Sequence, residues 1–186
     1  YDADWRESTY KNYFWMVPYD LQGLIDSIGG KEAAEKRLDE MFRRLDASYG
    51  DEWFASGNEP SFQIPWIYNW AGAPYKAQQV IRRILNEQYS SRVNGLPGND
   101  DLGSMGAWYV FASIGLFPEI PGVGGFSVNS PVFRKIVLHL PEGDVIIKGG
   151  DEKKEYIHSL SLDGKKMEGT WIDWSDLYRG ATLEYK

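Results

Sequence analysis

Three short polar segments carry the side chains best suited to chemistry. In chain order they hold Glu7, then Asn58 with Glu59, and then Asn99, Asp100 and Asp101. Hydrolysis of a glycoside needs two carboxyls: one stays protonated to donate to the leaving oxygen, and the other is ionised as base or nucleophile. Glu7 and Glu59 have aromatic neighbours in sequence, and burial among such neighbours raises a carboxyl pKa, as an acid requires. The glycine-flanked Asp100-Asp101 pair could hold a water or a hard cation.

Each of these segments also has a simpler interpretation. Asn-Asp-Asp before a helix is typical of an N-cap whose acidic side chains favour the helix dipole. Asn58-Glu59-Pro60 could begin a helix with Pro in its first turn, and Glu7 could be a solvated surface acid. The Asp100-Asp101 pair lacks the spacing of an EF-hand, so calcium would need ligands from several segments. Chemistry alone therefore indicates no more than a candidate carbohydrate-active protein.

The bulk composition narrows the function classes. The 186 residues carry a net charge of −7 with no basic stripe, which argues against a nucleic-acid ligand. There is no cysteine and there are only two histidines, so thiolate metal sites are excluded and a histidine-based triad is not expected. No apolar run reaches the roughly 20 residues of a membrane span, so membrane insertion is not expected. The start at Tyr1-Asp2-Ala3 lacks an initiator Met, and we expect a cut into a longer chain.

Aromatic residues are abundant, at 8 Trp, 12 Tyr and 8 Phe. Most of them can be explained as filling of a large core. A carbohydrate site, where the apolar faces of sugar rings stack on Trp and Tyr, would use the same residue types. Composition alone does not decide between the two interpretations.

Helical spacing of apolar residues dominates the first two thirds of the chain. It predicts one helix over 31–49, which follows the break at Gly29-Gly30, and a second from Pro74 to Tyr89. The small and apolar stretch 103–115 predicts a third helix, buried on most sides. We therefore place a helical domain at 1–120.

The pattern changes to strands beyond about residue 126. We predict strands at 135–140, 145–148 and 182–185, and a hairpin turned by Asp163-Gly164. This antiparallel β segment occupies 121–186 in our division. Helices followed by a run of strands indicate two packed units.

Seven motifs, spaced along essentially the whole chain, have to be considered together. They are Glu7 through Trp15-Met16-Val17-Pro18-Tyr19-Asp20, Gly57-Asn58-Glu59-Pro60-Ser61, Gly95–Gly103 running into Ala107-Trp108-Tyr109-Val110, Gly115-Leu116-Phe117-Pro118, Pro121-Gly122, Ser130-Pro131-Val132-Phe133 and Gly180–Glu184. In this order they resemble those of the calcium-dependent exo-α-mannosidases of glycoside hydrolase family 92. Several motifs in one order are more specific than any single motif.

The resemblance implies an α+β multidomain fragment. Its helices would be the last ones of an (α/α)₆ toroid, and its antiparallel strands would belong to an associated β-sandwich. The rest of the toroid would be the upstream part of the same polypeptide. The implied activity is hydrolysis of terminal α-linked mannose, expected to be of the α-1,2 type, from glycans by a calcium-assisted inverting mechanism.

The resemblance also implies roles for single residues. Glu7 falls where the family has its general acid, and Asp101, with Asp100 in support, falls where it has its general base. Asn58 and Glu59 fall in the motif that helps to build the calcium and mannose site. Further substrate-binding candidates are Asn99 and Trp15.

The chain departs from the family pattern at a few positions. Asn99 stands where many members have a second Asp, and Lys11-Asn12 stands where the family usually has Trp-Gln. Tyr19 and Phe62 stand where it often has His. We predict that the changed neighbours line the sugar subsites and affect the linkage preference.

The leading hypothesis is an exo-α-mannosidase with calcium as cofactor and a mannose-containing glycan as substrate, secreted or periplasmic. The alternative is a non-catalytic glycan-binding protein on the same scaffold, and a third possibility is a structural module without a ligand. If the upstream helices are absent, the isolated fragment should expose apolar helix faces and be weakly active or inactive.

Overall fold

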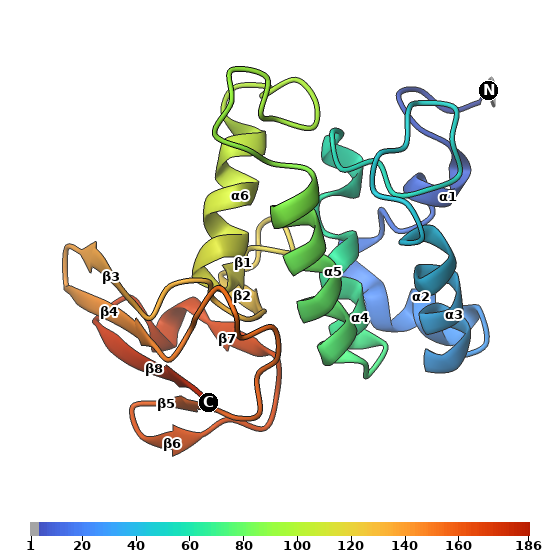
Figure 1. Ribbon diagram of the computed structural model, residues 1–186. Coiled ribbons are helices and arrows are strands. Elements are labelled where there is room, and N and C mark those ends of the chain that lie inside the picture. Colours follow the sequence, from blue (N-terminus) through green and yellow to red (C-terminus); the bar gives the residue numbers. More distant parts are fainter. Residues whose placement is uncertain (1–3) are drawn as a thin grey trace. The chain divides into compact units, whose positions relative to one another are not determined.

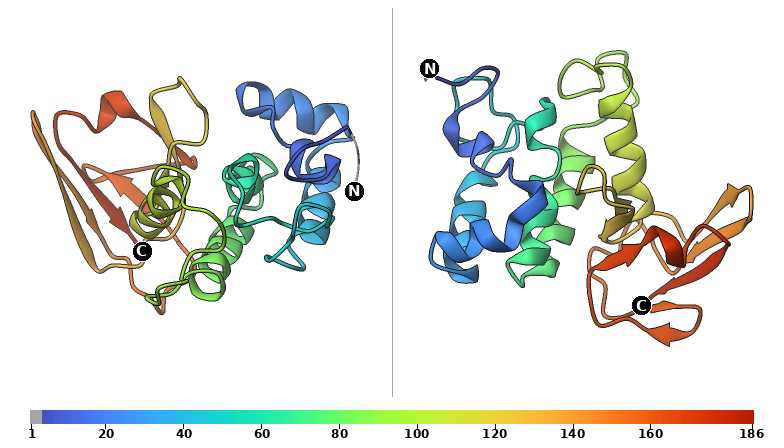
Figure 2. Two further views of the ribbon diagram at one scale, coloured as in Figure 1. Left: turned by 90° about the horizontal axis from the view of Figure 1, so that it is seen from above. Right: turned by 180° about the vertical axis from the view of Figure 1, so that it is seen from behind.

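A computed structural model describes residues 4–186, so the expectation for Tyr1-Asp2-Ala3 lies outside the described residues. The chain divides into two compact units, one ending at Tyr109 and the other covering Val110–Lys186. The division falls within helix α6 (Ser104–Ile114). The described part of the first unit holds helices, and the second unit holds the end of α6 and the β-strands (Figures 1 and 2). The predicted order of helices followed by strands is confirmed.

The first unit consists of mostly short helices joined by turns and loops. They are α1 (Tyr10–Tyr13), α2 (Leu21–Ser27), α3 (Lys31–Met41), α4 (Ile67–Trp70), α5 (Pro74–Glu87) and α6, with 3₁₀ turns at Pro18–Asp20, Glu59–Ser61 and Ile64–Trp66. Helix α5 begins at Pro74, as predicted, because a proline at the first helical position has a suitable φ and needs no amide partner. No helix within residues 4–186 is long and apolar enough to cross a membrane.

Helix α3 is shorter than the sequence predicted, since it ends at Met41 and not near Tyr49. The apolar residues Phe42 and Leu45 are nevertheless buried, because the chain folds back on itself after the helix. The Phe54 amide donates to the Met41 carbonyl at 3.2 Å, which closes this loop. Spacing that looked helical therefore belongs to a buried loop.

Aromatic side chains fill much of the core of the first unit. Trp66 and Trp108 are buried and meet edge to face, with ring centroids 5.6 Å apart, and Tyr89 stacks on Trp108 at 5.7 Å. The core-filling interpretation therefore holds for these rings. The prediction that 103–115 is buried on most sides is wrong, because Tyr109 and Val110 on α6 are 42% and 56% exposed.

The second unit holds two β-sheets. One has the order β1 (Leu116–Phe117), β2 (Gly125–Val128), β7 (Trp171–Asp173), and the other has the order β3 (Lys135–Leu140), β4 (Gly143–Lys148), β8 (Ala181–Tyr185), β5 (Leu160–Leu162), β6 (Lys165–Lys166). All pairs are antiparallel except β4 and β8, which run parallel with Val145 opposite Ala181. A short 3₁₀ turn follows β7 at Trp174–Asp176.

The predicted hairpin between β5 and β6 is confirmed. Asp163 and Gly164 have φ values of 49° and 78°, and a two-residue turn with positive φ at both positions matches the twist of the flanking strands. The Asp163 carboxylate also accepts a hydrogen bond from the Thr182 amide on β8 at 2.7 Å. The turn is therefore tied to the neighbouring strand of its own sheet.

Candidate active site

The loop before α1 holds Glu7 in an uncommon conformation. Its φ is 64°, in the left-handed region, and its side chain is exposed. The Glu7 carbonyl accepts a hydrogen bond from Asn58 Nδ2 at 2.5 Å, and the preceding carbonyl, of Arg6, accepts one from the Tyr13 hydroxyl at 2.5 Å. Burial and the charge of Glu7 raise the pKa of Tyr13. A non-glycine residue keeps a positive φ where its surroundings hold it, and these two side chains do so on either side of the Glu7 amide.

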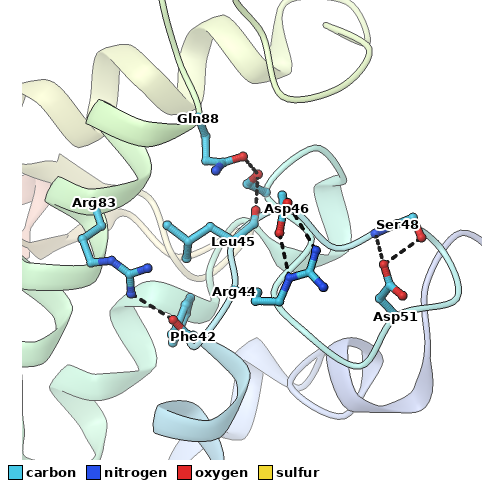
Figure 3. A network of polar contacts seen from close by, with 9 residues as sticks. Phe42, Arg44, Leu45, Asp46, Ser48, Asp51, Arg83 and Gln88 are labelled. Atoms are coloured by element: carbon cyan, nitrogen blue, oxygen red, sulfur yellow. Dashed lines mark hydrogen bonds and ion pairs between the residues drawn. The ribbon is translucent and has the colours of Figure 1, made fainter.

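The second polar segment is anchored to α5 through the loop that follows α3. Figure 3 shows this network of polar contacts. Ser56 Oγ lies 2.7 Å from the Leu45 carbonyl and 3.1 Å from Gln88 Oε1, while Arg83 donates to the Phe42 carbonyl at 2.9 Å (Figure 3). The chain is thus fixed at Ser56, two residues before Asn58.

Two glycines allow the second and third polar segments to meet. A Cβ on Gly57 would lie 2.5 Å from the Pro97 carbonyl oxygen, and a Cβ on Gly98 would lie 2.2 Å from the Gly57 oxygen. Neither position has room for a side chain, so glycine at both allows the backbones to touch. This contact brings Asn58-Glu59 towards the loop that carries the Asp100-Asp101 pair.

We expect Gly57→Ala and Gly98→Ala to separate these two segments. Forcing a methyl group into such a contact shifts the backbone, and overpacking of this kind destabilises by about 1–3 kcal/mol. Gly50→Ala is the matched control, because a Cβ there meets nothing within 4 Å. Urea unfolding of the three variants of the full-length protein measures the effect. Equal stability of all three would contradict the close contact.

The third polar segment caps helix α6 with its first acidic residue. Asp100 Oδ1 accepts a hydrogen bond from the Gly106 amide at 3.1 Å, so Asp100 caps the first turn of α6 although it lies three residues before the N-cap position. Ser104 Oγ lies 3.0 Å from the Asp100 carbonyl and 3.2 Å from Glu59 Oε1. This hydroxyl links the second and third segments, and Ser104 was not among the predicted site residues. Its position at the start of a predicted helix, next to an acidic loop, was the available signal.

Asp101 points its carboxyl into a group of acidic residues. Its backbone, like those of Leu102 and Gly103, has positive φ, with values of 44°, 61° and 91°. A hydrogen bond with the Glu59 carboxyl raises the pKa of Asp101, and desolvation and the charges of Glu59, Glu7 and Asp100 add to the effect. Three segments far apart in sequence therefore bring Glu7, Glu59 and Asp101 together.

The oxygen atoms of this cluster suit calcium, although they do not complete a site for it. Within residues 4–186 no three His, Cys, Asp or Glu side chains are placed to hold a metal ion together. The Glu59 carboxylate and the amide oxygen of Asn58 are the hard donors that calcium prefers. A cation at Glu59 would also offset the negative charges of Glu59, Glu7 and Asp100 around Asp101. The residues present therefore fit part of a calcium site, and further ligands would be backbone carbonyls, waters or sugar hydroxyls.

A hollow of about 260 Å³ lies beside Asn58. Asn99 is one of its lining residues, and its role in substrate binding stays a prediction. The complete lining is Ala47, Ser48, Tyr49, Ala55, Gly57, Asn58, Pro97, Gly98 and Asn99. The hollow thus opens between the second and third polar segments, next to the side chain that holds Glu7.

Other predicted site residues have different positions. Trp15 is only 1% exposed and packs edge to face against Phe14, so the structure gives it a core position. Asn12 is fully buried, so the prediction that it lines a sugar subsite is wrong. Lys11 pairs with Glu52 at 2.6 Å.

The remaining two changed positions are Tyr19 and Phe62, and the Phe62 amide donates a hydrogen bond to the Glu59 carbonyl at 3.0 Å. Tyr19 is 81% exposed, and its side chain lies largely in solvent. Phe62 is half-buried, and its carbonyl oxygen accepts a hydrogen bond from Trp108 Nε1 at 3.0 Å. Their predicted role in the sugar subsites stays a prediction.

Known proteins similar to this chain are glycosidases. The model of one protein family, described as the glycosyl hydrolase family 92 catalytic domain, matches residues 1–186. A protein from Arthroderma benhamiae named an uncharacterized secreted glycosidase is 31% identical over 188 residues, which cover 96% of this chain and 23% of that protein.

Solved structures show the same similarity. The family GH92 alpha-mannosidase BT3965 from Bacteroides thetaiotaomicron is 31% identical with a TM-score of 0.85, over 99% of this chain and 26% of that one. The family GH92 inverting mannosidase BT2199 from the same species is 29% identical with a TM-score of 0.87, over 100% of this chain and 29% of that one. The chain thus spans about a quarter of the length of these relatives.

Proposed function

This chain belongs to glycosyl hydrolase family 92, and we propose from that premise that it supplies the catalytic carboxyls of a secreted, calcium-dependent exo-α-mannosidase. The observation that carries the proposal is the meeting of Glu7, Glu59 and Asp101 from three distant segments. Asn58 and Asn99, which are close to Glu59 and Asp101 in sequence, line a hollow. The names of the solved relatives, which are alpha-mannosidases, support the choice of sugar.

In the proposed reaction Glu7 is the general acid and Asp101 the general base. Glu7 protonates the glycosidic oxygen as the bond to the anomeric carbon breaks, and the alcohol leaves. Asp101 takes a proton from a water that attacks the opposite face, so an α-mannoside gives β-mannose. The name of one solved relative, an inverting mannosidase, supports this stereochemistry.

Asn58 and Glu59 would hold the calcium through their side-chain oxygens. Bound there, the ion would supply a Lewis acid for two sugar hydroxyls and favour the distorted ring of the transition state. Asn58 has a second role that the geometry makes plain: its amide nitrogen holds the carbonyl of Glu7. One side chain therefore joins the acid to the motif proposed for the metal and the sugar.

The proposed substrate is a terminal α-1,2-linked mannose of a glycan. The hollow between the second and third polar segments, lined by Asn58 and Asn99, would take one sugar unit. Secretion is proposed because a relative matched over 96% of this chain is named a secreted glycosidase. A mannose-containing glycan would be met outside the cell.

The test is release of mannose from an α-mannoside by the full-length protein. We expect release with calcium, loss of release after addition of a chelator, and recovery when calcium is restored, because the Asn58-Glu59 pair needs a cation to organise the sugar. Magnesium serves as the matched control, since it prefers a smaller octahedral site.

The other outcomes separate the alternatives. Calcium-dependent binding of mannose without release would support the glycan-binding alternative. A melting temperature that neither calcium nor any sugar shifts would favour a structural module, because a ligand that binds only the folded state raises that temperature.

A further inference from the structure

Hydrogen bonds between side chains and backbone carbonyls join the segment 51–61 to the segment that carries Glu7 at three points. The contacts are Asn58 Nδ2 to the Glu7 carbonyl at 2.5 Å, Thr9 Oγ1 to the Asp51 carbonyl at 3.3 Å, and Asn12 Nδ2 to the Trp53 carbonyl at 2.9 Å. The same segment contains the Asn58-Glu59 motif. The acid is therefore fixed to the motif proposed for the metal and the sugar, and not only to helix α1, which follows it in the chain.

A fourth and more deeply buried contact joins Asn12 to Ser61. Both side chains are 0% exposed, and Ser61 Oγ donates to Asn12 Oδ1 at 3.0 Å. Asn12 lies five residues after Glu7, and Ser61 lies two residues after Glu59. The two ends of the Asn12 amide are thus both bonded, one to Ser61 and one to Trp53.

We infer that Asn12 and Ser61 are positioning residues that set Glu7 relative to Asn58-Glu59. A buried polar group left without its partner costs the free energy of its desolvation, so this hydrogen bond specifies one geometry and not several. Neither side chain reaches solvent, so neither touches a sugar. Their effect on the reaction passes through the backbone that carries Glu7.

This inference rests on the proposed mannosidase activity, and it predicts an effect that depends on the leaving group of the substrate. A misplaced acid slows only the reactions in which the leaving oxygen must receive a proton. An α-linked mannobiose has such a leaving group, whereas fluoride leaves α-mannosyl fluoride without one. Purely structural damage would slow the hydrolysis of both substrates together.

The experiment compares Ser61→Ala with the wild type in the full-length protein on both substrates. We expect kcat for the mannobiose to fall about 10- to 100-fold, since a displacement of about 1 Å can cost about 10²-fold. The KM should stay nearly unchanged, and kcat for the fluoride should fall much less. Glu52→Gln is the matched control, because it breaks the exposed ion pair with Lys11 between the same two segments. It should leave both rates near those of the wild type.

Asn12→Ser removes the other partner of the hydrogen bond between Ser61 and Asn12. It replaces Ser61→Ala in this experiment if that variant does not fold. Equal losses on the two substrates, or no loss on either, in a folded variant would overturn the positioning role. A wild-type protein that hydrolyses neither substrate would instead refute the proposed activity on which the inference is built.

Discussion

Replacing Glu7 by Gln should lower kcat for an α-linked mannobiose about 10²- to 10⁴-fold, the usual contribution of a general acid. The amide keeps the size of the side chain, and the backbone contacts to Asn58 and to the Tyr13 hydroxyl do not involve the carboxyl. The variant should therefore fold and bind the sugar normally. Steady-state kinetics of the full-length protein check the fall in kcat, and its affinity for mannose checks that binding is unchanged.

A substrate whose leaving group needs no proton tests the acid role of Glu7 directly. Glu7→Gln should retain most of its activity on α-mannosyl fluoride, because fluoride departs without a proton. The Glu52→Gln variant is again the control, since it removes a carboxyl from the facing segment without touching the acidic cluster. Full activity of Glu7→Gln on the mannobiose would assign the acid to another residue. A wild-type protein that binds mannose but releases none from the mannobiose would favour the glycan-binding alternative.

The two residues of the Asp100-Asp101 pair have different surroundings. Asp100 caps the first turn of α6 through the Gly106 amide, and Asp101 faces Glu59. Three successive positive φ values, from Asp101 to Gly103, turn the chain between the acidic cluster and the helix. The capping contact holds the loop in place, so the structural role of Asp100 fixes the position of Asp101.

Local spacing was sufficient for elements whose contacts are also local. The start of α5 at Pro74 and the turn at Asp163-Gly164 follow from the preferences of single residues, and both were predicted. The end of α3 at Met41 could not be predicted in this way. Phe42 and Leu45 continue a helical spacing, but they are buried by a chain that returns from Phe54.

The cluster of carboxyls could be expected only from the resemblance to a family, because spacing does not bring residues 7, 59 and 101 together. The contact between Gly57 and Gly98 and the hydroxyl of Ser104 show how the segments meet. The changed residue Asn12 shows the limit of motif comparison. It looked like part of a sugar subsite, whereas its burial against Ser61 makes it part of the support.

A second prediction concerns Asp101, the proposed general base, and separates its role from that of Glu7, the proposed acid. Asp101→Asn should also lower kcat for the mannobiose about 10²- to 10⁴-fold, because no group would then take the proton of the attacking water. An activated leaving group should not restore this loss, since the missing step lies on the other face of the sugar. Glu7→Gln and Asp101→Asn should thus respond in opposite ways to α-mannosyl fluoride.

Azide should restore part of the activity of Asp101→Asn, because this anion attacks without losing a proton. It would form a bond to the anomeric carbon from the face opposite the leaving group, while Glu7 protonates the departing oxygen, and the product would be a β-mannosyl azide. Asp100→Asn serves as the control; it keeps a side-chain oxygen that can cap α6 and leaves the Asp101 carboxyl in place, so azide should not stimulate it. Detection of the β-azide by NMR would assign the base to Asp101 and the stereochemistry to inversion. An α-azide, or stimulation of Asp100→Asn in its place, would assign the base elsewhere.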